Sequence, residues 1–596
     1  MQKFNYDEIL DPVKEYEHRY KNDFSKKASA FFEDIVKKSN VNEEANAKLV
    51  DEIKLLQNKL SDLSMHYSMW LFAMIVLIII LIIGIVITVV YLIDMKSGAA
   101  YGAAIAIWIP ALVLWVYALK FTVKKIRHFK SNILKTQPIL SGKQREAWDM
   151  MLPLNNQFQW ETVNNLIVQT LPIFEIDRFF NKARLRQMCT EYGLEDFGDD
   201  CSVQCCQSGS INGNPWAIVD TLNQNWKYVT YHGRKPVSYK TYETFTDEDG
   251  KTRGEWVTRT QILHATYREK APYYTREKVL IYGFKDDLKN LCFSRKPTNA
   301  AGDHGKEKER IKKVEKIARD TPMTAMANAK FEASFYAVDR NDERTFRKLY
   351  SASAQEATYN LLKDKKAGYG DDFSFEKRND LNILASAHMD NMNISGDPKK
   401  FHNFDLKVAR KIFLEFCEDY FRAFYFSFAP LLCSHIYQTH NWLDDDFPNA
   451  AGKEFASSYE CESIANFMGE RMFAPDHANT KSILKARIES ESNNNVQVNI
   501  SAKAFTILKC CAYVTKRAYD GRAHEVPVNY DLYVPISKDT RIVVSNPETA
   551  DSEVFDDLTR TKEWADYTVK IGADTKTQVY RRGLAAFLSK QPINQE

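Results

Sequence analysis

Cysteines form the densest cluster of residues that could do chemistry in this chain. Cys201, Cys205 and Cys206 lie close together, with Cys189 upstream. Structural zinc sites use pairs of cysteine or histidine ligands, usually two pairs. Here Cys201 and Cys205 could form one pair, but no second pair follows nearby. Cys205 and Cys206 are adjacent and would point to opposite sides of a strand. The pattern favours reduced, partly buried thiols, with a metal site as the alternative.

A second polar group consists of Cys433, His435 and His440, followed by Asp444–Asp446. Two residues five apart on a helix are separated by about 140° around its axis, so the two histidines would not share a face. A loop could still bring them together. We therefore keep a metal or acid–base site as the alternative and favour a structural role.

Sequence motifs of common enzyme classes are not found: a phosphate-binding loop, a Gly-x-Ser-x-Gly elbow, a His-Glu-x-x-His pair and a dinucleotide fingerprint. Cys510 and Cys511 lie in a strand-like run, where neighbours face opposite sides. We expect no catalytic, cofactor-binding or metal-binding residue, and a binding or scaffolding protein. The alternative is a membrane-tethered, hydrolase-like enzyme whose pocket gathers distant residues such as His264, His388 or His435.

One stretch departs from a globular pattern. Residues Met69 to Ile93 contain no charge. A helix of this length would reach about 37 Å, more than the hydrocarbon core of about 30 Å. A second uncharged run, Ala99 to Leu119, follows after Asp94 and Lys96, and its Pro110 would kink a helix. Because so few residues separate the runs, we predict a transmembrane hairpin.

Basic residues determine the predicted orientation of this hairpin. Six of them follow the second run, in a stretch without acids: Lys120, Lys124, Lys125, Arg127, Lys130 and Lys135. The loop between the runs offers Lys96 alone. Since basic flanks stay on the cytoplasmic side, we expect a two-span cell-membrane protein with both termini in the cytoplasm. We expect no cleavable signal, because the first apolar run begins far from residue 1. The basic stretch would also attract anionic lipid head groups, so an anionic-lipid-contacting protein is a third possible function.

The composition is that of an ordinary globular protein, with 44% hydrophobic and 27% charged residues. The formal net charge is only +3, so a nucleic-acid partner bound by bulk charge is not expected. Ten cysteines are too few for a disulfide framework, and in a reducing compartment they should be free. The partners that we expect are the lipid bilayer and either another protein or a second copy of the chain.

Changes in composition and patterning divide the chain into seven predicted segments. They are an N-terminal helical segment (1–66), the transmembrane hairpin (67–122), juxtamembrane helices (123–192), a β-rich unit (193–295), a linker with a charged helix (296–330), an α/β segment ending in an aromatic helix (331–440) and a C-terminal α+β unit (441–596). The expected fold class is α+β, with antiparallel β units in a large cytoplasmic region.

Within these segments several elements can be predicted. Four dipeptides favour turns: Asn212-Gly213, His232-Gly233, Asp249-Gly250 and Asp520-Gly521. The third of them lies between two alternating runs, which indicates a hairpin. We also expect a helix break at Pro138–Gly142 and a strand at Phe331–Val338. The aromatic stretch Phe413–Cys433 contains charges that exclude a membrane span, so we favour a core helix over a membrane-surface or partner-binding face.

Apolar residues recur at heptad spacing just before the first apolar run. They are Leu49, Ile53, Leu56, Leu60 and Leu63. This seam covers barely two heptads, whereas a free-standing coiled coil needs about three or four. We therefore favour a helix that packs on its own chain, with self-association as the alternative.

Four stretches, in this order, suggest a relationship to a known family. They read CSVQCCQSGSINGNPWAIVDT, DEDGKTRGEWVTRTQILHATYRE, FEASFYAVDRNDERTFRKLYSASAQEATYNLL and FSFEKRNDLNILASAHMD. With the apolar pair and the basic helix, this layout resembles the uncharacterised bacterial two-pass membrane proteins that carry the domain of unknown function 3137. The resemblance covers roughly residues 65–395 and implies two spans followed by a β-rich cytoplasmic part. It implies no catalytic residues, and the chain from Asp397 onward departs from the family pattern.

Overall fold

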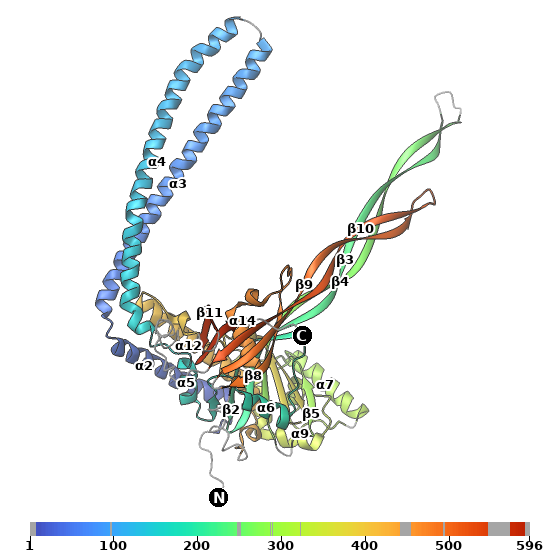
Figure 1. The fold of residues 1–596 in the computed structure, drawn as a ribbon. Helices are drawn as coiled ribbons and strands as arrows, with labels where there is room; N and C mark the ends of the chain where they lie inside the picture. The colour runs from blue at the N-terminus through green and yellow to red at the C-terminus, as the bar shows by residue number, and fades with distance from the viewer. Residues whose placement is uncertain are drawn as a thin grey trace. The chain divides into compact units, whose positions relative to one another are not determined.

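The computed structural model describes most of the chain. The described residues are 8–95, 98–246, 252–285, 288, 290–321, 323–441, 455–492, 495–545 and 573–589. They form a mixed α and β structure with antiparallel sheets, as predicted (Figure 1). The chain divides into two compact units: unit 1 is Met1–Ala28, Gln159–Asp397 and Phe416–Glu596, and unit 2 is Ser29–Phe158 and Pro398–Glu415.

Unit 2 is built around two long antiparallel helices, α3 (Glu43–Met95) and α4 (Gly98–Asn155), which lie side by side (Figure 1). The side chain of Asn42 accepts a hydrogen bond from the Ala45 N–H at 3.0 Å and so caps the start of α3. Unit 2 also contains η2 (Pro398–Phe401) and parts of α2 (Lys21–Ser39) and α12 (Leu406–Leu432).

The heptad seam packs on its own chain, as predicted. Leu49 and Ile53 of α3 are buried in one cluster with Leu140 and Ala147 of α4. The break expected at Pro138–Gly142 is wrong, since α4 continues through it. A proline removes one backbone hydrogen bond, but the burial of Leu140 against α3 favours an unbroken helix at this point.

The larger sheet of unit 1 has seven antiparallel strands in the order β1-β2-β3-β4-β7-β6-β5. They are β1 (Phe174–Ile176), β2 (Cys201–Ile211), β3 (Asn214–Thr246), β4 (Thr252–Gly283), β5 (Cys292–Arg295), β6 (Phe373–Arg378) and β7 (Leu381–Ser386). The turn predicted at Asn212-Gly213 is confirmed, because both residues have positive φ and join β2 to β3. Trp216 of β3 is fully buried against Phe424 and Phe428 of α12, so the aromatic helix is a core helix.

The second sheet has five strands in the order β11-β12-β10-β9-β8. They are β8 (Ile483–Ser492), β9 (Asn495–Arg517), β10 (Ala523–Ser545), β11 (Ala573–Arg581) and β12 (Leu584–Ser589). Helix α14 (Ser458–Phe473) packs on β8 and also on β2 of the larger sheet. Its Ile464 and Phe473 are buried with Leu484 and Val498 in the core of the second sheet. Helix α14 therefore connects the two sheets.

Shorter helices complete unit 1. They are α1 (Pro12–Glu15), η1 (Tyr16–Tyr20), α5 (Thr162–Thr170), α6 (Lys182–Tyr192), α7 (His304–Asp320), α8 (Ala329–Phe335), α9 (Glu343–Leu349), α10 (Ala352–Lys363), α11 (Ala387–Asn391) and η3 (His435–Gln438). The strand expected at Phe331–Val338 is wrong, since α8 occupies most of it. Asn328 caps α8 by accepting a hydrogen bond from the Phe331 N–H at 3.1 Å. Phe331 and Phe335 stack one turn apart, at the spacing that a helix requires.

Strands β3 and β4 continue well beyond the sheet as a two-stranded ribbon (Figure 1). Their pairing is unbroken from Trp216 with Tyr282 to Thr246 with Thr252, whereas β3 pairs with β2 as far as Asn223. A second ribbon, formed by β9 and β10, packs along the first. We call the parts of both ribbons beyond the sheets the β arm, residues 226–246, 252–272, 506–517 and 523–534. At about 3.3 Å per residue, the longer ribbon spans about 70 Å.

The turn predicted at His232-Gly233 is wrong, because both residues lie within β3. A Cβ atom on Gly233 would lie 2.2 Å from the Pro527 carbonyl oxygen of the second ribbon. This glycine therefore permits close packing between the ribbons. The turn predicted at Asp520-Gly521 is confirmed between β9 and β10, with Gly521 at φ 78°. Asp249-Gly250 lies outside the described residues.

Candidate functional site

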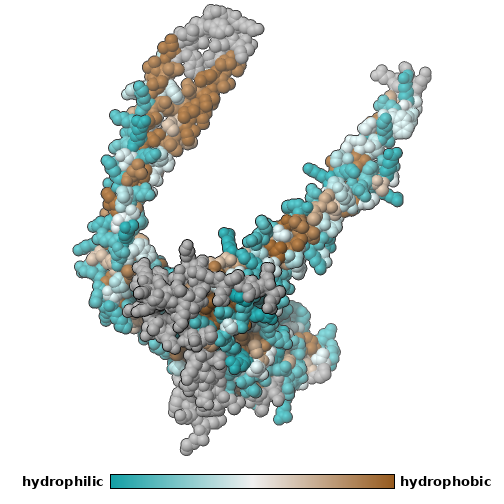
Figure 2. All heavy atoms as spheres, viewed as in Figure 1, coloured by the Kyte–Doolittle hydropathy of each residue, from teal (hydrophilic) through white to brown (hydrophobic). Residues whose placement is uncertain are grey.

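The most apolar part of α3 is exposed. Among the residues that the structure describes, one helix is long and apolar enough to cross a membrane, Glu43–Ile87, and its most apolar stretch is not buried. Hydrophobic residues form a band along the helix pair (Figure 2). By length and composition this band matches a hydrocarbon core. The second span expected at Ala99–Leu119 is not supported by the same criterion, so the two-helix hairpin stays a proposal.

Side chains of α3 and α4 contact each other along this apolar band. The indole N–H of Trp115 on α4 donates to the Leu77 carbonyl oxygen of α3 at 2.9 Å. Nearby, the rings of Trp70 and Phe121 meet edge to face with centres 5.6 Å apart. Since the Trp115 N–H finds its acceptor on the neighbouring helix, it needs no water. This pairing suits an environment without water.

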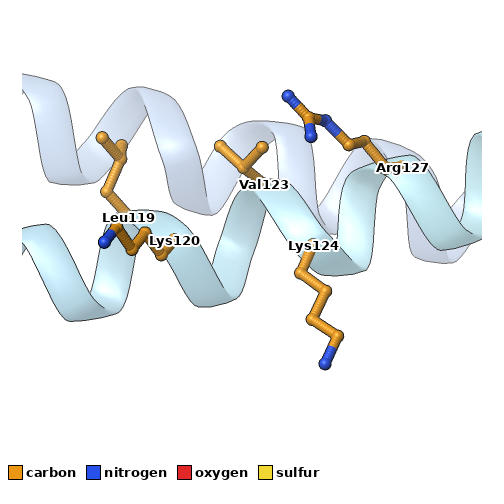
Figure 3. Close-up of a pocket in the computed structure, with 5 residues that line it drawn as sticks. All are labelled: Leu119, Lys120, Val123, Lys124 and Arg127. Carbon is orange, nitrogen blue, oxygen red and sulfur yellow. The ribbon is translucent and has the colours of Figure 1, made fainter.

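Next to the band, α4 carries a hollow of about 320 Å³. The residues that line it are Leu119, Lys120, Val123, Lys124 and Arg127 (Figure 3). The three basic residues are four and three positions apart and so share one side of α4. Lys124 points away from the two helices (Figure 3). The sequence has no acid at 120–145, and none at 65–73, the part of α3 that faces the hollow. Cations with no acid nearby attract anionic groups such as a lipid phosphate.

His388 takes part in a chain of hydrogen bonds with Asp372 and Ser427. Its Nδ1 donates to Asp372 Oδ2 at 2.6 Å, and its Nε2 lies 3.2 Å from Ser427 Oγ. Serine hydrolases arrange an acid, a base and a nucleophile in this order. Ser427 is only 3% exposed, and its hydroxyl donates to the Ala423 carbonyl oxygen at 2.7 Å. Because a hydroxyl carries one proton, this bond competes with donation to His388.

The other residues considered from the sequence are not brought to this chain of hydrogen bonds. His264 is exposed on the β arm, and His435 and His440 are exposed at η3 or just after it, whereas Cys433 is buried. Asp444–Asp446 lie outside the described residues. In the part of the chain that the structure describes, no three His, Cys, Asp or Glu side chains form a group that could hold a metal.

The cysteines Cys201, Cys205 and Cys206 lie buried on β2 as free thiols, as predicted, and Cys189 is exposed. Burial raises the pKa of Cys201 to about 12 and the pKa of Cys206 well above its ordinary value. The Cys206 thiol donates to Glu460 at 3.3 Å. Cys201 and Cys206 are therefore held in the protonated form. Cys510 and Cys511 are neighbours within β9, as expected for a strand.

Sequence reasoning missed two buried carboxylates on α14, Glu460 and Glu462. Glu462 accepts hydrogen bonds from the Val203 N–H at 2.5 Å and the Ala486 N–H at 3.2 Å. Lys485 Nζ lies 3.7 Å away. Burial raises the pKa of Glu462 to about 7. Its two backbone partners lie on β2 and β8, so this carboxylate bridges the two sheets. The available signal was two acids two positions apart in a stretch, 457–469, that is otherwise uncharged.

Comparison of the chain with family models, curated proteins and solved structures finds no match. The family resemblance drawn from the sequence therefore stays a prediction. The function has to be inferred from the geometry of the chain itself.

Proposed function

We propose that the chain is an integral membrane protein with two spans, Met69–Ile93 and Ala99–Leu119, and that the parts on both sides of this hairpin lie in the cytoplasm. The observation that carries the proposal is the exposed apolar stretch of α3. An apolar surface of this extent marks contact with a membrane or a partner. The acid-free basic stretch of α4 supports the orientation, since such stretches stay on the cytoplasmic side.

The large part beyond the hairpin, on this proposal, binds another protein. Its support is the β arm, which presents aromatic side chains to solvent: Tyr228, Tyr242 and Trp256 are 59%, 56% and 67% exposed. Aromatic residues on a surface are typical of protein interfaces. A second copy of the chain is an alternative partner.

Membrane fractionation tests the proposed insertion, and capture of a partner through a tag tests the proposed binding role. The full-length tagged protein should stay in the membrane pellet through alkaline carbonate washing and leave it with detergent. From solubilised membranes, the tag should then retain a partner in defined stoichiometry. Full-length protein in the high-speed supernatant without detergent would contradict membrane insertion. Protein that is solubilised without any partner, as a monomer, would contradict the binding role.

A second candidate is a membrane-tethered hydrolase, favoured by the order Asp372, His388, Ser427. A fluorophosphonate probe reacts with activated serines, so a hydrolase should be labelled and Ser427→Ala should abolish the labelling. Absence of labelling, or labelling retained in that variant, would remove this candidate.

A further inference from the structure

The longer ribbon of the β arm has two different faces. Its register pairs even-numbered residues of β3 with even-numbered residues of β4, from Trp226 with Pro272 to Thr246 with Thr252. Side chains along a strand alternate between faces. The even-numbered residues of 226–246 and 252–272, eleven from each strand, therefore share one face, which we call the outer face. All are exposed except Gly254 and Pro272, which are half-buried.

The opposite face of this ribbon is occupied. Its odd-numbered Val237, Leu263 and Ala265 are buried against Val526 and Val528 of the β9–β10 ribbon. Among the described residues, the second ribbon thus packs on one side of the first and leaves the outer face in solvent, except at the base, where the Trp226 ring meets Phe505 of β9 with ring centres 5.2 Å apart.

The outer face contains no acidic residue. Its charged residues are Arg234, Lys240, Arg268 and Lys270, with His232 and His264 among them. The same stretches hold three acids, Glu243, Glu255 and Glu269, and all three have odd numbers, so they lie on the opposite face. A surface with cations and no acids carries a positive potential that attracts an anionic partner.

Aromatic side chains flank these cations. Near the base of the arm, the Arg268 guanidinium lies 5.2 Å from the ring centre of Tyr228. Near the far end, Tyr242 and Trp256 are direct cross-strand neighbours with ring centres 5.3 Å apart. Tyrosine, tryptophan and arginine contribute most of the binding energy at protein interfaces. A face of eleven residues per strand matches the roughly 20–30 residues that one partner gives to a standard interface.

The spacing of the charges distinguishes the classes of partner. By the register, Lys270, Arg268, Arg234 and Lys240 lie level with positions 228, 230, 234 and 240 of β3, so they are about 7, 13 and 20 Å apart along the ribbon. A nucleic-acid strand carries a phosphate about every 3.4 Å. A two-stranded ribbon twists strongly, so a flat bilayer would touch only part of the outer face. A flexible polypeptide can follow the twist and place carboxylates at the wider spacing.

We propose that the outer face docks an acidic, extended segment of a partner protein. Arg234, Lys240, Arg268 and Lys270 pair with its carboxylates, and the exposed aromatic rings pack on its apolar side chains. This inference rests on the proposed function, in that the large part of the chain binds a protein, and it names the surface and the chemistry of the partner.

The test uses the full-length protein in detergent and a fluorescent copolymer of glutamate and tyrosine as the probe. The outer-face variant is Arg234→Glu with Arg268→Glu. The matched control, Lys516→Glu with Arg522→Glu, makes the same charge change on the β9–β10 hairpin. The outer-face variant should bind the copolymer at least about ten-fold more weakly than wild type, and the control should bind as wild type does. Trp256→Ala, which keeps the charge, should also weaken binding.

Equal affinities of the outer-face variant and the control, when both unfold at the wild-type temperature, would overturn the inference. Tighter binding of oligo(dT) or of phosphatidylglycerol vesicles than of the copolymer would also overturn it and would assign the face to nucleic acid or lipid. A partner captured from solubilised membranes separates the two proposals. If the outer-face variant retains it fully, the binding function stands and this surface assignment fails. If wild type retains none, the binding function fails.

Discussion

Glu462 is a carboxylate that the fold keeps from water between α14, β2 and β8. Burial raises its pKa from 4.5 to about 7, although two backbone N–H groups and Lys485 favour the charged form. Because the folded state holds this proton more tightly than the unfolded state, its contribution to the free energy of unfolding is present below about pH 4.5. That contribution is lost as the pH rises to about 7.

Glu462→Gln should therefore flatten the dependence of stability on pH. The full effect of this group is on the order of 3 kcal/mol, the free energy that corresponds to the raised pKa. Unfolding temperatures of the full-length protein in detergent, measured from mildly acidic to mildly alkaline pH, check it. Glu309→Gln on the exposed side of α7 is the matched control and should follow the wild-type curve. If the Glu462→Gln curve ran parallel to wild type, Glu462 would not titrate in this range.

Individual helices and turns could be predicted where residues close together in the sequence determine them. The heptad seam, the Asn212-Gly213 turn and the aromatic core helix have local signals, and the structure contains all three. The turn predicted at His232-Gly233 is absent. The glycine instead allows close packing against Pro527, which lies almost three hundred residues away in the sequence. The segment Phe331–Val338, expected as a strand, is mostly helical, and the four-residue spacing of Phe331 and Phe335 brings their rings together on the helix.

The same holds for the candidate sites: residues that are neighbours in the sequence could be predicted together, and residues that meet only in the fold could not. The basic stretch of α4 can be read from the sequence, since its residues are neighbours. Asp372 and Ser427 lie 16 and 39 residues from His388 and carry no motif, so only the fold reveals that they meet. The outer face likewise depends on the register between β3 and β4. A turn predicted at His232-Gly233 would end the strand there, so the sequence alone does not give this register.

The basic hollow of α4 should bind anionic lipid. In detergent, phosphatidylglycerol should raise the unfolding temperature of the full-length protein more than phosphatidylcholine does, because each cation near a lipid surface contributes about 1 kcal/mol. The variant Lys120→Gln, Lys124→Gln, Arg127→Gln should lose this difference. The control, Lys306→Gln, Lys308→Gln, Lys312→Gln on α7, should keep it. A preference for phosphatidylglycerol that survives in the first variant would exclude this hollow as the lipid site.

For the molecule as a whole, the proposed membrane hairpin and the β arm belong to different units, and each can be tested by itself. Composition and two uncharged runs suffice to propose where the protein resides. They do not predict an arm about 70 Å long, since its length depends on pairing between residues up to 46 positions apart.

The most direct test of the account is the number of times that the chain crosses the membrane. All ten cysteines follow the hairpin in sequence, and Cys189 and Cys511 are exposed, so they report the side on which the large part lies. In intact cells, a membrane-impermeant maleimide should label Lys96→Cys and leave the native cysteines unlabelled until the cells are opened. Labelling of both the native cysteines and Lys96→Cys in intact cells would mean a single crossing, and protection of both until the cells are opened would mean none. Labelling of the native cysteines alone would mean a hairpin of the opposite orientation. Each of these results would contradict the proposed hairpin with both termini in the cytoplasm.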